Sequence, residues 1–207
     1  MILVAMLFLL MTPAQQNFTK FSYCRESASG DFEMLCIDLD SSGVGQARFK
    51  RRDDDDLKVA VALSPAGKNQ FLSALSGTKY LEKASTYESK RKVADLGKKH
   101  LTLEMPSGRR EAEFNYSDLK DVNALVTFFE GLITQEAIAI DLKWALQFDR
   151  LGIPERLDQL ENVLKQGRIT DPKSMVDVLA QIDHDENIVN YARVHARELS
   201  ERITSGK

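Results

Sequence analysis

The sequence predicts an α+β fold: an antiparallel β-sheet of about six strands with packing helices, followed by an all-helical C-terminal subdomain. Three observations predict it. Apolar and polar residues alternate with period two in several short runs of the first half. Apolar residues recur at helical spacing throughout the second half, which carries no strand pattern. With 43% hydrophobic and 29% charged residues, the composition is that of a globular protein and not of a disordered chain.

The N-terminus predicts export. Residues 2–11 form an unbroken apolar run that is followed by Thr12, Pro13 and Ala14. A membrane-spanning helix needs about 20 apolar residues, so this run suits a secretory signal, with small residues before a cut at Gln15. No Lys or Arg precedes it, and the α-amino group is the only positive charge there. A buried N-terminal strand is the alternative, which the lack of alternation disfavours. We expect a signal peptide over residues 1–14 and a secreted or periplasmic protein.

Apolar residues and cysteines predict the same register for the first hairpin. Pairing Tyr23 with Ile37 on one face places Cys24 directly opposite Cys36 on the other. Opposed residues of an antiparallel pair have Cα atoms about 4.5–5.5 Å apart, within reach of a disulfide. The chain has only 2 cysteines and no Cys-x-x-Cys motif, and a zinc site needs three or four ligands. A structural disulfide is therefore favoured over a metal site, free thiols or a redox-active pair.

Two further strands and a short helix follow this hairpin. The alternation continues through residues 47–49 and again over residues 59–63. Ser64 then provides a helix N-cap, and Pro65 suits the first helical position. The apolar spacing predicts a short helix that ends at Gly77.

A second hairpin is predicted around a two-residue turn. Residues 101–105 and 112–116 alternate on either side of Ser107-Gly108. With these two residues as the turn, Leu103 lies opposite Ala112. The matching of apolar residues across the two strands supports that register.

The remaining helices divide the chain into a sheet domain, residues 15–133, and a helical subdomain, residues 134–207. A cap at Ser117-Asp118 opens the last helix of the sheet domain, whose apolar stripe covers residues 122–133. The helices of the second part are expected from about Ile138 to Gly152, from Pro154 to Gly167, after an N-cap at Thr170-Asp171 with Pro172 at the first position, and from about Ile188 to Ile203. Because no fixed-period repeat is present, we expect a compact subdomain packed on the sheet domain and not a repeat array.

The order of elements over residues 18–133, with the strand-to-helix junction Leu63-Ser64-Pro65, resembles a known group of domains. These are the emfourin-like domains, small secreted protein inhibitors of thermolysin-type metalloproteases. The chain also resembles exported bacterial proteins that pair such a domain with a helical tail. The resemblance implies an exported, inhibitor-like protein, and it assigns inhibition to no residue of this chain.

Composition and motifs narrow the function classes. The net charge of −3 gives no reason to expect nucleic acid or an anionic membrane as the main partner. Gly-x-Ser-x-Gly, His-Glu-x-x-His, a P-loop and a Gly-x-Gly-x-x-Gly turn are all absent, and no cofactor is implied. The acidic run at Asp53–Asp56 lacks the alternate spacing of calcium loops and is interpreted as solvated. His184, Asp185 and Glu186 offer metal-ligand types, but a solvated loop between helices is the favoured interpretation. The sequence therefore favours a non-enzyme with no metal site.

A basic concentration in the long polar excursion over residues 78–99 is the candidate binding surface. Its members are Lys90, Arg91, Lys92, Lys98 and Lys99. A solvated loop is the plainer interpretation, but a long loop on a small sheet is where a binding function would lie. Asn17 and Asn115 begin Asn-x-Ser/Thr sequences, and hydrogen bonding beside a helix cap explains Asn115 without a sugar.

We therefore expect a non-catalytic module that contacts an extracytoplasmic protein through this excursion or the exposed faces of the C-terminal helices. Two alternatives stay open. One is an exported hydrolase with a site between the two halves that uses His100, His184 or His195. The other is a structural envelope protein.

Overall fold

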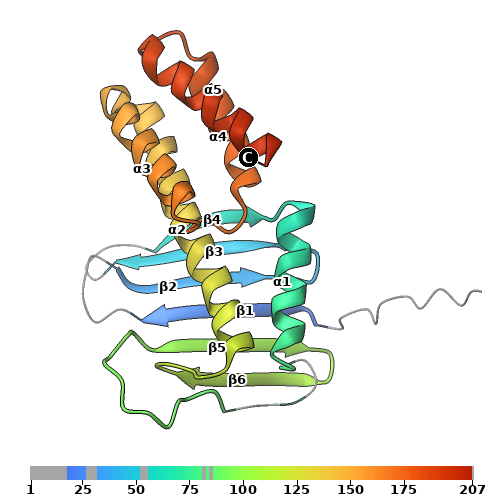
Figure 1. The fold of residues 1–207 in the computed structure, drawn as a ribbon. Helices are drawn as coiled ribbons and strands as arrows, with labels where there is room; N and C mark the ends of the chain where they lie inside the picture. The colour runs from blue at the N-terminus through green and yellow to red at the C-terminus, as the bar shows by residue number, and fades with distance from the viewer. Residues whose placement is uncertain (1–17, 27–31, 52–55, 81–82, 84–85, 207) are drawn as a thin grey trace, which may run out of the picture.

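The computed structural model describes residues 18–26, 32–51, 56–80, 83 and 86–206 (Figure 1). The predicted signal peptide, Asn17 and most of the acidic run at 53–56 lie outside these residues.

A six-stranded antiparallel sheet forms the first half, as predicted (Figure 1). Its strands are β1 (Lys20–Glu26), β2 (Phe32–Leu39), β3 (Val44–Arg51), β4 (Leu57–Ala62), β5 (Lys99–Met105) and β6 (Gly108–Phe114). Their order across the sheet is β4-β3-β2-β1-β5-β6, so the first strand lies in the interior of the sheet and pairs with both β2 and β5.

Helices cover one face of this sheet and then extend beyond it (Figure 1). They are α1 (Pro65–Gly77), α2 (Lys120–Phe148), α3 (Ile153–Lys165), α4 (Val176–His184) and α5 (Asn190–Ser205), with short 3-10 turns η1 (Arg150–Gly152) and η2 (Pro172–Met175). The first part of α2 lies beside α1 on the sheet, and its second part packs with α3 and α4. The last helix, α5, packs on α3 and α4.

One continuous helix joins the two halves. A helix break near residue 133 was expected, but α2 runs for 29 residues through that position. Gln135 and Glu136 interrupt the apolar stripe there, yet both are buried. Gln135 accepts a hydrogen bond from the Asp171 N–H and donates one to Ser174. Because these polar groups are satisfied, the helix continues while its apolar face changes partner.

Two hydrophobic cores meet along α2. The first contains buried residues from Phe18 to Ile133 and lies between the sheet and the helices α1 and α2. The second contains buried residues from Ile138 to Ile203 and lies among the C-terminal helices.

The first hairpin has the predicted register. Tyr23 pairs with Ile37 on the helix-covered face, and Cys24 pairs with Cys36 on the open face. Cys24 and Cys36 form a disulfide, with their Cα atoms 4.1 Å apart. The bond joins two neighbouring strands in the interior of the sheet.

The register predicted for the second hairpin is wrong by two residues. Leu103 pairs with Arg110 and not with Ala112, which pairs with Leu101. The turn is Pro106-Ser107, because proline has the φ that the first turn position needs and no N–H for a strand pair. Gly108, with φ +135°, is already the first residue of β6. A shift of two residues keeps every side chain on its predicted face.

Of the three predicted side-chain caps, only Ser64 acts as one. Its hydroxyl accepts a hydrogen bond from the Gly67 N–H at the start of α1. The predicted cap at Ser117-Asp118 is wrong, since Leu119 is the residue at the N-cap of α2. Asp171 does occupy the predicted N-cap position before Pro172. Neither aspartate carboxylate, however, binds the start of its own helix. Both bind partners that are distant in sequence, Arg91 and Ser64 respectively.

Candidate functional site

Two buried tyrosines attach the excursion between α1 and β5 to the hydrophobic core. Tyr80 and Tyr87 are buried, with ring centroids 5.7 Å apart, and the ring of Tyr87 lies 5.8 Å from that of Phe114. The Tyr80 carbonyl also accepts a hydrogen bond from Arg110. These aromatic side chains therefore extend the core under the excursion and are not available to stack on a ligand.

The five basic residues of the predicted binding surface do not form one surface. Lys99 is only 8% exposed, and its Nζ donates to the carbonyls of Gly97 and Asn115 at 3.0 and 2.7 Å. Burial lowers the pKa of this amine. Arg91 pairs with Asp118, and Lys98 pairs with Glu113.

Lys90 and Lys92 remain exposed, and no ion pair or hydrogen bond of either one occurs among the described residues. The surface predicted from the sequence is thereby reduced to these two side chains. The other three cations hold the excursion to the sheet domain.

Asn115, which follows β6, also binds the excursion through hydrogen bonds. Its side-chain nitrogen donates to the carbonyl of Ala94 at 2.9 Å, and its side-chain oxygen accepts from the N–H of Leu96 at 2.8 Å. Its backbone N–H donates to Glu88. The side-chain hydrogen bonds of Asn115 are therefore not local to the helix cap, which was the expectation, but engage loop residues 19 and 21 positions earlier in the chain.

A hollow of about 670 Å³ beside the excursion is lined by several carboxylates. They belong to Glu26, Glu33, Glu88, Asp95 and Glu113. Each already has a partner: His100 for Glu26, Lys50 for Glu33, backbone N–H groups for Glu88 and Asp95, and Lys98 for Glu113. Within the described part of the chain, no group of three or more His, Cys, Asp or Glu side chains is arranged to hold a metal ion.

The structure does not bring the three histidines together. His100 lies on the open face of the sheet, between Glu26 at 2.9 Å and Glu113 at 3.3 Å. His184 ends α4 and contacts the carbonyl of Ala180. His195 lies between α5 and α3, with Asp158 and Glu161 at 3.6 and 3.9 Å.

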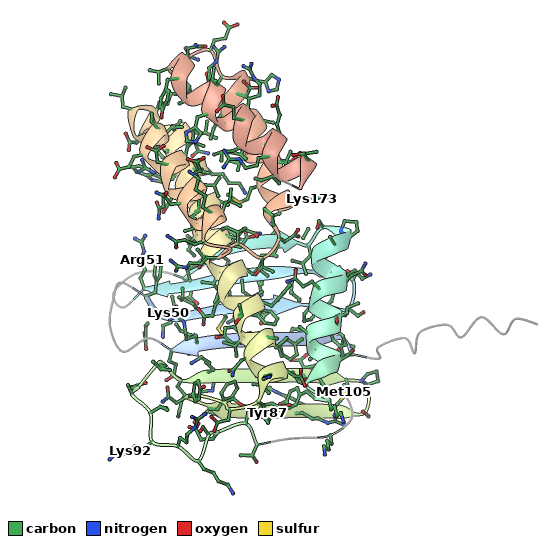
Figure 2. All side chains as sticks on the ribbon, in the orientation of Figure 1. Lys50, Arg51, Tyr87, Lys92, Met105 and Lys173 are labelled. Carbon is green, nitrogen blue, oxygen red and sulfur yellow. A yellow bond between two sulfur atoms is a disulfide. The ribbon has the colours of Figure 1, made fainter. Side chains whose placement is uncertain are left out.

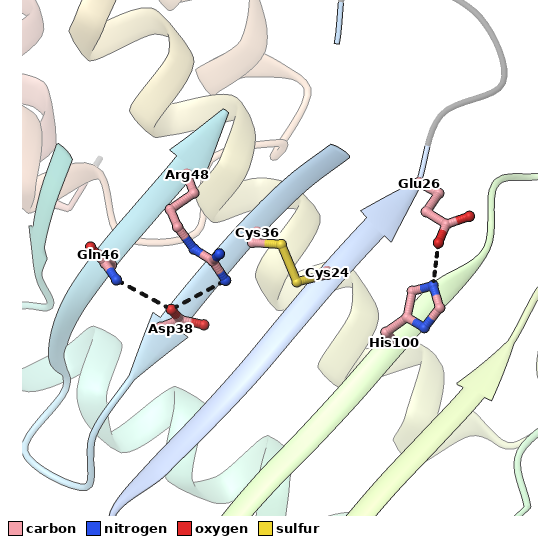
Figure 3. Close-up of a disulfide and its surroundings, with 7 residues drawn as sticks. All are labelled: Cys24, Glu26, Cys36, Asp38, Gln46, Arg48 and His100. Atoms are coloured by element: carbon pink, nitrogen blue, oxygen red, sulfur yellow. Dashed lines mark hydrogen bonds and ion pairs between the residues drawn. A yellow bond between two sulfur atoms is a disulfide. The ribbon is translucent and has the colours of Figure 1, made fainter. Parts of the chain in front are cut away.

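The open face of the sheet carries paired polar groups around the disulfide (Figure 3). On one side of the disulfide, Asp38 lies 3.5 Å from Arg48 and accepts a hydrogen bond from Gln46. On the other side, His100 contacts Glu26. Charges on this face are thus matched mainly by their neighbours in the sheet.

The turns from α2 into α3 and from α4 into α5 lie at the end of the helical subdomain that is far from the sheet (Figure 1). Apolar side chains are exposed at this far end. We define the far-end surface as Trp144, Phe148, Leu151, Val189 and Tyr191, which are 50%, 70%, 85%, 48% and 63% exposed. They include every exposed aromatic side chain among the large hydrophobic residues of the described chain.

Contacts within α2 and between α2, α3 and the two turns fix the side chains at this end. The rings of Trp144 and Phe148 lie 5.6 Å apart, and the guanidinium of Arg156 lies 5.8 Å from the Trp144 ring centroid. An ion pair of 3.4 Å between Arg150 and Asp185 links the two turns. A signal for this surface exists in the sequence, since Trp144, Phe148 and Leu151 lie at i, i+4 and i+7 beside the buried stripe.

No protein-family model matches the chain, and no curated protein matches it. None of the helices in the described part of the chain combines the length and apolar character needed to cross a membrane.

Proposed function

We propose that this protein is an exported, non-catalytic protein-binding module that contacts its partner through the far-end surface. One observation carries the proposal: Trp144, Phe148 and Tyr191 are all exposed, and all lie at the same end of the helical subdomain. Exposed apolar residues scattered singly are ordinary, whereas several gathered in one place are typical of an interaction site.

The residue types and their spacing support a protein partner with an apolar groove. Trp, Tyr and Arg are the residues most enriched among those that dominate binding energy, and this surface contains Trp144 beneath Arg156. Trp144 and Phe148 lie at i and i+4 at the end of α2, a spacing by which a helix enters a groove, and Leu151 follows in η1. All three are exposed near the end of a helical hairpin, so a concave apolar surface on the partner would cover them.

The charges around this surface favour a protein over an anionic lipid. Arg150 is paired with Asp185, and Arg156 with Asp149 at 3.1 Å. Binding to anionic membranes is driven by an excess of Lys and Arg near the surface. Because these arginines are already neutralised by carboxylates, such an excess is missing here.

The disulfide supports export. Structural disulfides persist in oxidising compartments and are rare in the cytosol, and Cys24 and Cys36 are bonded in this fold. Together with the apolar N-terminal run, this bond supports secretion or a periplasmic location.

The test is capture of partners from the extracytoplasmic fraction of the source cell. The bait is the purified disulfide-bonded protein, compared with Phe148→Ser/Leu151→Ser. The matched control is Val44→Ser/Leu57→Ser, which removes two exposed apolar side chains from the sheet. We expect one protein to be recovered stoichiometrically by the parent and the control, and at least about tenfold less by the far-end variant, because each lost anchor costs about 1–2 kcal/mol.

Three results would count against the proposal. Equal recovery by all three baits would place the contact elsewhere, and an empty capture would bring the hydrolase alternative to the front. Capture of only the chain itself or of cell-wall material would favour a structural envelope role. Circular dichroism of each bait establishes that the variants are folded.

A further inference from the structure

We propose that the anchored loop, residues 89–97, enters the active-site cleft of a serine protease of trypsin-like specificity as a slowly cleaved, inhibitory substrate. Lys92 would occupy the primary specificity pocket, and Lys92–Val93 would be the bond presented to the catalytic serine. This surface is separate from the far-end surface, so the two proposals stand or fall independently.

The centre of the anchored loop is exposed and projects from the body of the protein. Residues 91–96 are exposed without interruption and belong to no helix or strand. The side chain of Lys92 reaches away from the sheet domain (Figure 2). A protease needs such a protruding, irregular segment, because it binds its substrate as an extended chain within a cleft.

The N-terminal flank of Lys92 is tied to the segment between β6 and α2. The Ser89 N–H donates to the Tyr116 carbonyl at 2.8 Å, and the Ser89 hydroxyl donates to Asp118. The Nε of Arg91 donates to the same carboxylate at 2.9 Å, and the Arg91 N–H donates to the Ser89 hydroxyl at 3.0 Å. The residue immediately before Lys92 is therefore held by both its backbone and its side chain.

The C-terminal flank is tied by Asn115 and by a glycine turn. Asn115 bridges the Ala94 carbonyl and the Leu96 N–H, so the attachment begins two residues after Lys92. Gly97 has φ +84°, and a Cβ at this position would lie 2.5 Å from the carbonyl oxygen of Glu26. Only glycine fits there, and the chain is directed back into β5.

The positive charge of Lys92 indicates which class of protease would bind the loop. A trypsin-like protease binds a Lys or Arg side chain through an aspartate in its primary pocket. Arg91 is neutralised by Asp118, whereas Lys92 has no ion pair among the described residues. Lys92 also lies between the two sets of anchors, directly after Arg91 and two residues before Ala94.

The anchors explain why such a loop would inhibit the protease. The catalytic serine Oγ attacks the Lys92 carbonyl carbon, the bond to the Val93 nitrogen breaks, and the protease histidine delivers the serine proton to that nitrogen. Both new ends remain tied to the scaffold, so the Val93 amine stays beside the acyl group. It attacks the ester, reforms the peptide bond and returns the proton to the serine through the histidine. Holding the two groups together favours this reversal over hydrolysis.

The experiment measures trypsin activity on a chromogenic lysyl peptide in the presence of the purified, disulfide-bonded protein. We expect inhibition that persists for hours while most of the protein remains uncut, as judged by mass spectrometry. Lys92→Ala should raise the inhibition constant by at least about 100-fold, as expected for a central charged anchor. Lys92→Arg should retain inhibition, and the neighbouring control Lys90→Ala should leave it unchanged.

Asn115→Ala separates a positioning role from simple binding. Without the bridge from Asn115 to Ala94 and Leu96, the new amine can leave, so this variant should be cut rapidly at Lys92–Val93 while its circular dichroism stays native. Absence of inhibition by the parent, or cleavage of the parent as fast as Asn115→Ala, would overturn the proposal. Inhibition of a thermolysin-type metalloprotease with trypsin unaffected would also overturn it, and would support the resemblance to emfourin-like domains.

Phe148→Ser/Leu151→Ser keeps the two proposals distinguishable. It should inhibit trypsin as well as the parent does, since it leaves the anchored loop intact. Loss of inhibition in this variant would contradict the assignment of the protease contact to Lys92.

Discussion

The carboxylate of Asp171 accepts hydrogen bonds from both the N–H and the hydroxyl of Ser64, at 2.6 Å each, across 107 residues of sequence. Ser64 caps α1 on the sheet, whereas Asp171 lies just before η2 in the helical subdomain. Asp171 is 2% exposed, and its own N–H donates to Gln135 in the middle of α2. One buried aspartate thus joins α1, α2 and the C-terminal helices.

Asp171→Ala should destabilise the protein by about 3 kcal/mol, because it leaves the two Ser64 donors without their charged acceptor in a buried site. Gly67→Ala should act in the same direction, since its Cβ would lie 2.6 Å from the Asp171 carboxylate. The measurement is urea unfolding followed by circular dichroism and by the fluorescence of Trp144, the single tryptophan.

The matched control is Asp141→Ala, which removes an exposed carboxylate from α2 and should change the free energy of unfolding by less than about 0.5 kcal/mol. A loss in Asp171→Ala no larger than in this control would show that the junction does not stabilise the fold.

Glu136→Gln should stabilise the protein at neutral pH. Burial raises the pKa of Glu136, with the Asp171 charge acting in the same direction and the Gln135 hydrogen bond and Lys143 opposing it. A carboxyl whose pKa is raised on folding stabilises fully below its unfolded pKa of about 4.3, and this contribution is lost as pH rises through the folded pKa. The neutral glutamine amide does not incur this cost and keeps an acceptor for Gln135.

Unfolding free energies of the parent and of Glu136→Gln, measured between pH 4 and pH 8, check this expectation. The advantage of the variant should grow with pH across that range. A constant difference, or one that shrinks with rising pH, would mean that Glu136 is not penalised by burial.

Removal of the disulfide should cost about 3 kcal/mol, the value expected for a loop of this size. Cys24 and Cys36 are 12 residues apart in sequence, so reduction releases only a short loop in the unfolded chain. The double variant Cys24→Ala/Cys36→Ala should unfold at the same denaturant concentration with and without dithiothreitol. The parent should shift to that midpoint only when it is reduced, and an unchanged midpoint in the reduced parent would contradict the estimate.

Tyr23→Phe should weaken the protein by about 2 kcal/mol near pH 8, through loss of a hydrogen bond to a charged group. The Tyr23 hydroxyl is fully buried and donates to Glu130 at 2.5 Å. Burial, followed by the charge of Glu130, raises the pKa of this phenol. The stability that it contributes is therefore present below the unfolded pKa of about 10 and falls above it.

The free-energy difference between the parent and Tyr23→Phe should thus shrink as pH rises from 9 to 11. Tyr191→Phe, at an exposed position, serves as the control and should show no such trend. A difference that stays constant to pH 11 would rule out the coupling between ionisation of Tyr23 and unfolding.

Local patterns predicted the elements but not the partners of isolated polar residues. Asp118 and Asp171 each precede a helix and each match a cap pattern, yet Arg91 and Ser64 bind them instead. A carboxylate can accept several hydrogen bonds. Which donors it binds depends on the groups that the fold places near it. The basic run from Lys90 to Lys99 was likewise divided by tertiary contacts into buried, paired and exposed members.

The sequence by itself determined the α+β class, the strands and their faces, and the pairing of Cys24 with Cys36, because period-two burial and a two-sided sheet leave one register that matches both apolar residues and cysteines. Only the tertiary structure decided that α2 continues through Gln135, that Asn115 anchors the loop around Lys92, and that Trp144 and Phe148 remain exposed. Those outcomes depend on which residues, distant in sequence, come into contact in the fold. The sequence pattern indicates burial and secondary structure, but it does not indicate which distant residues lie next to each other.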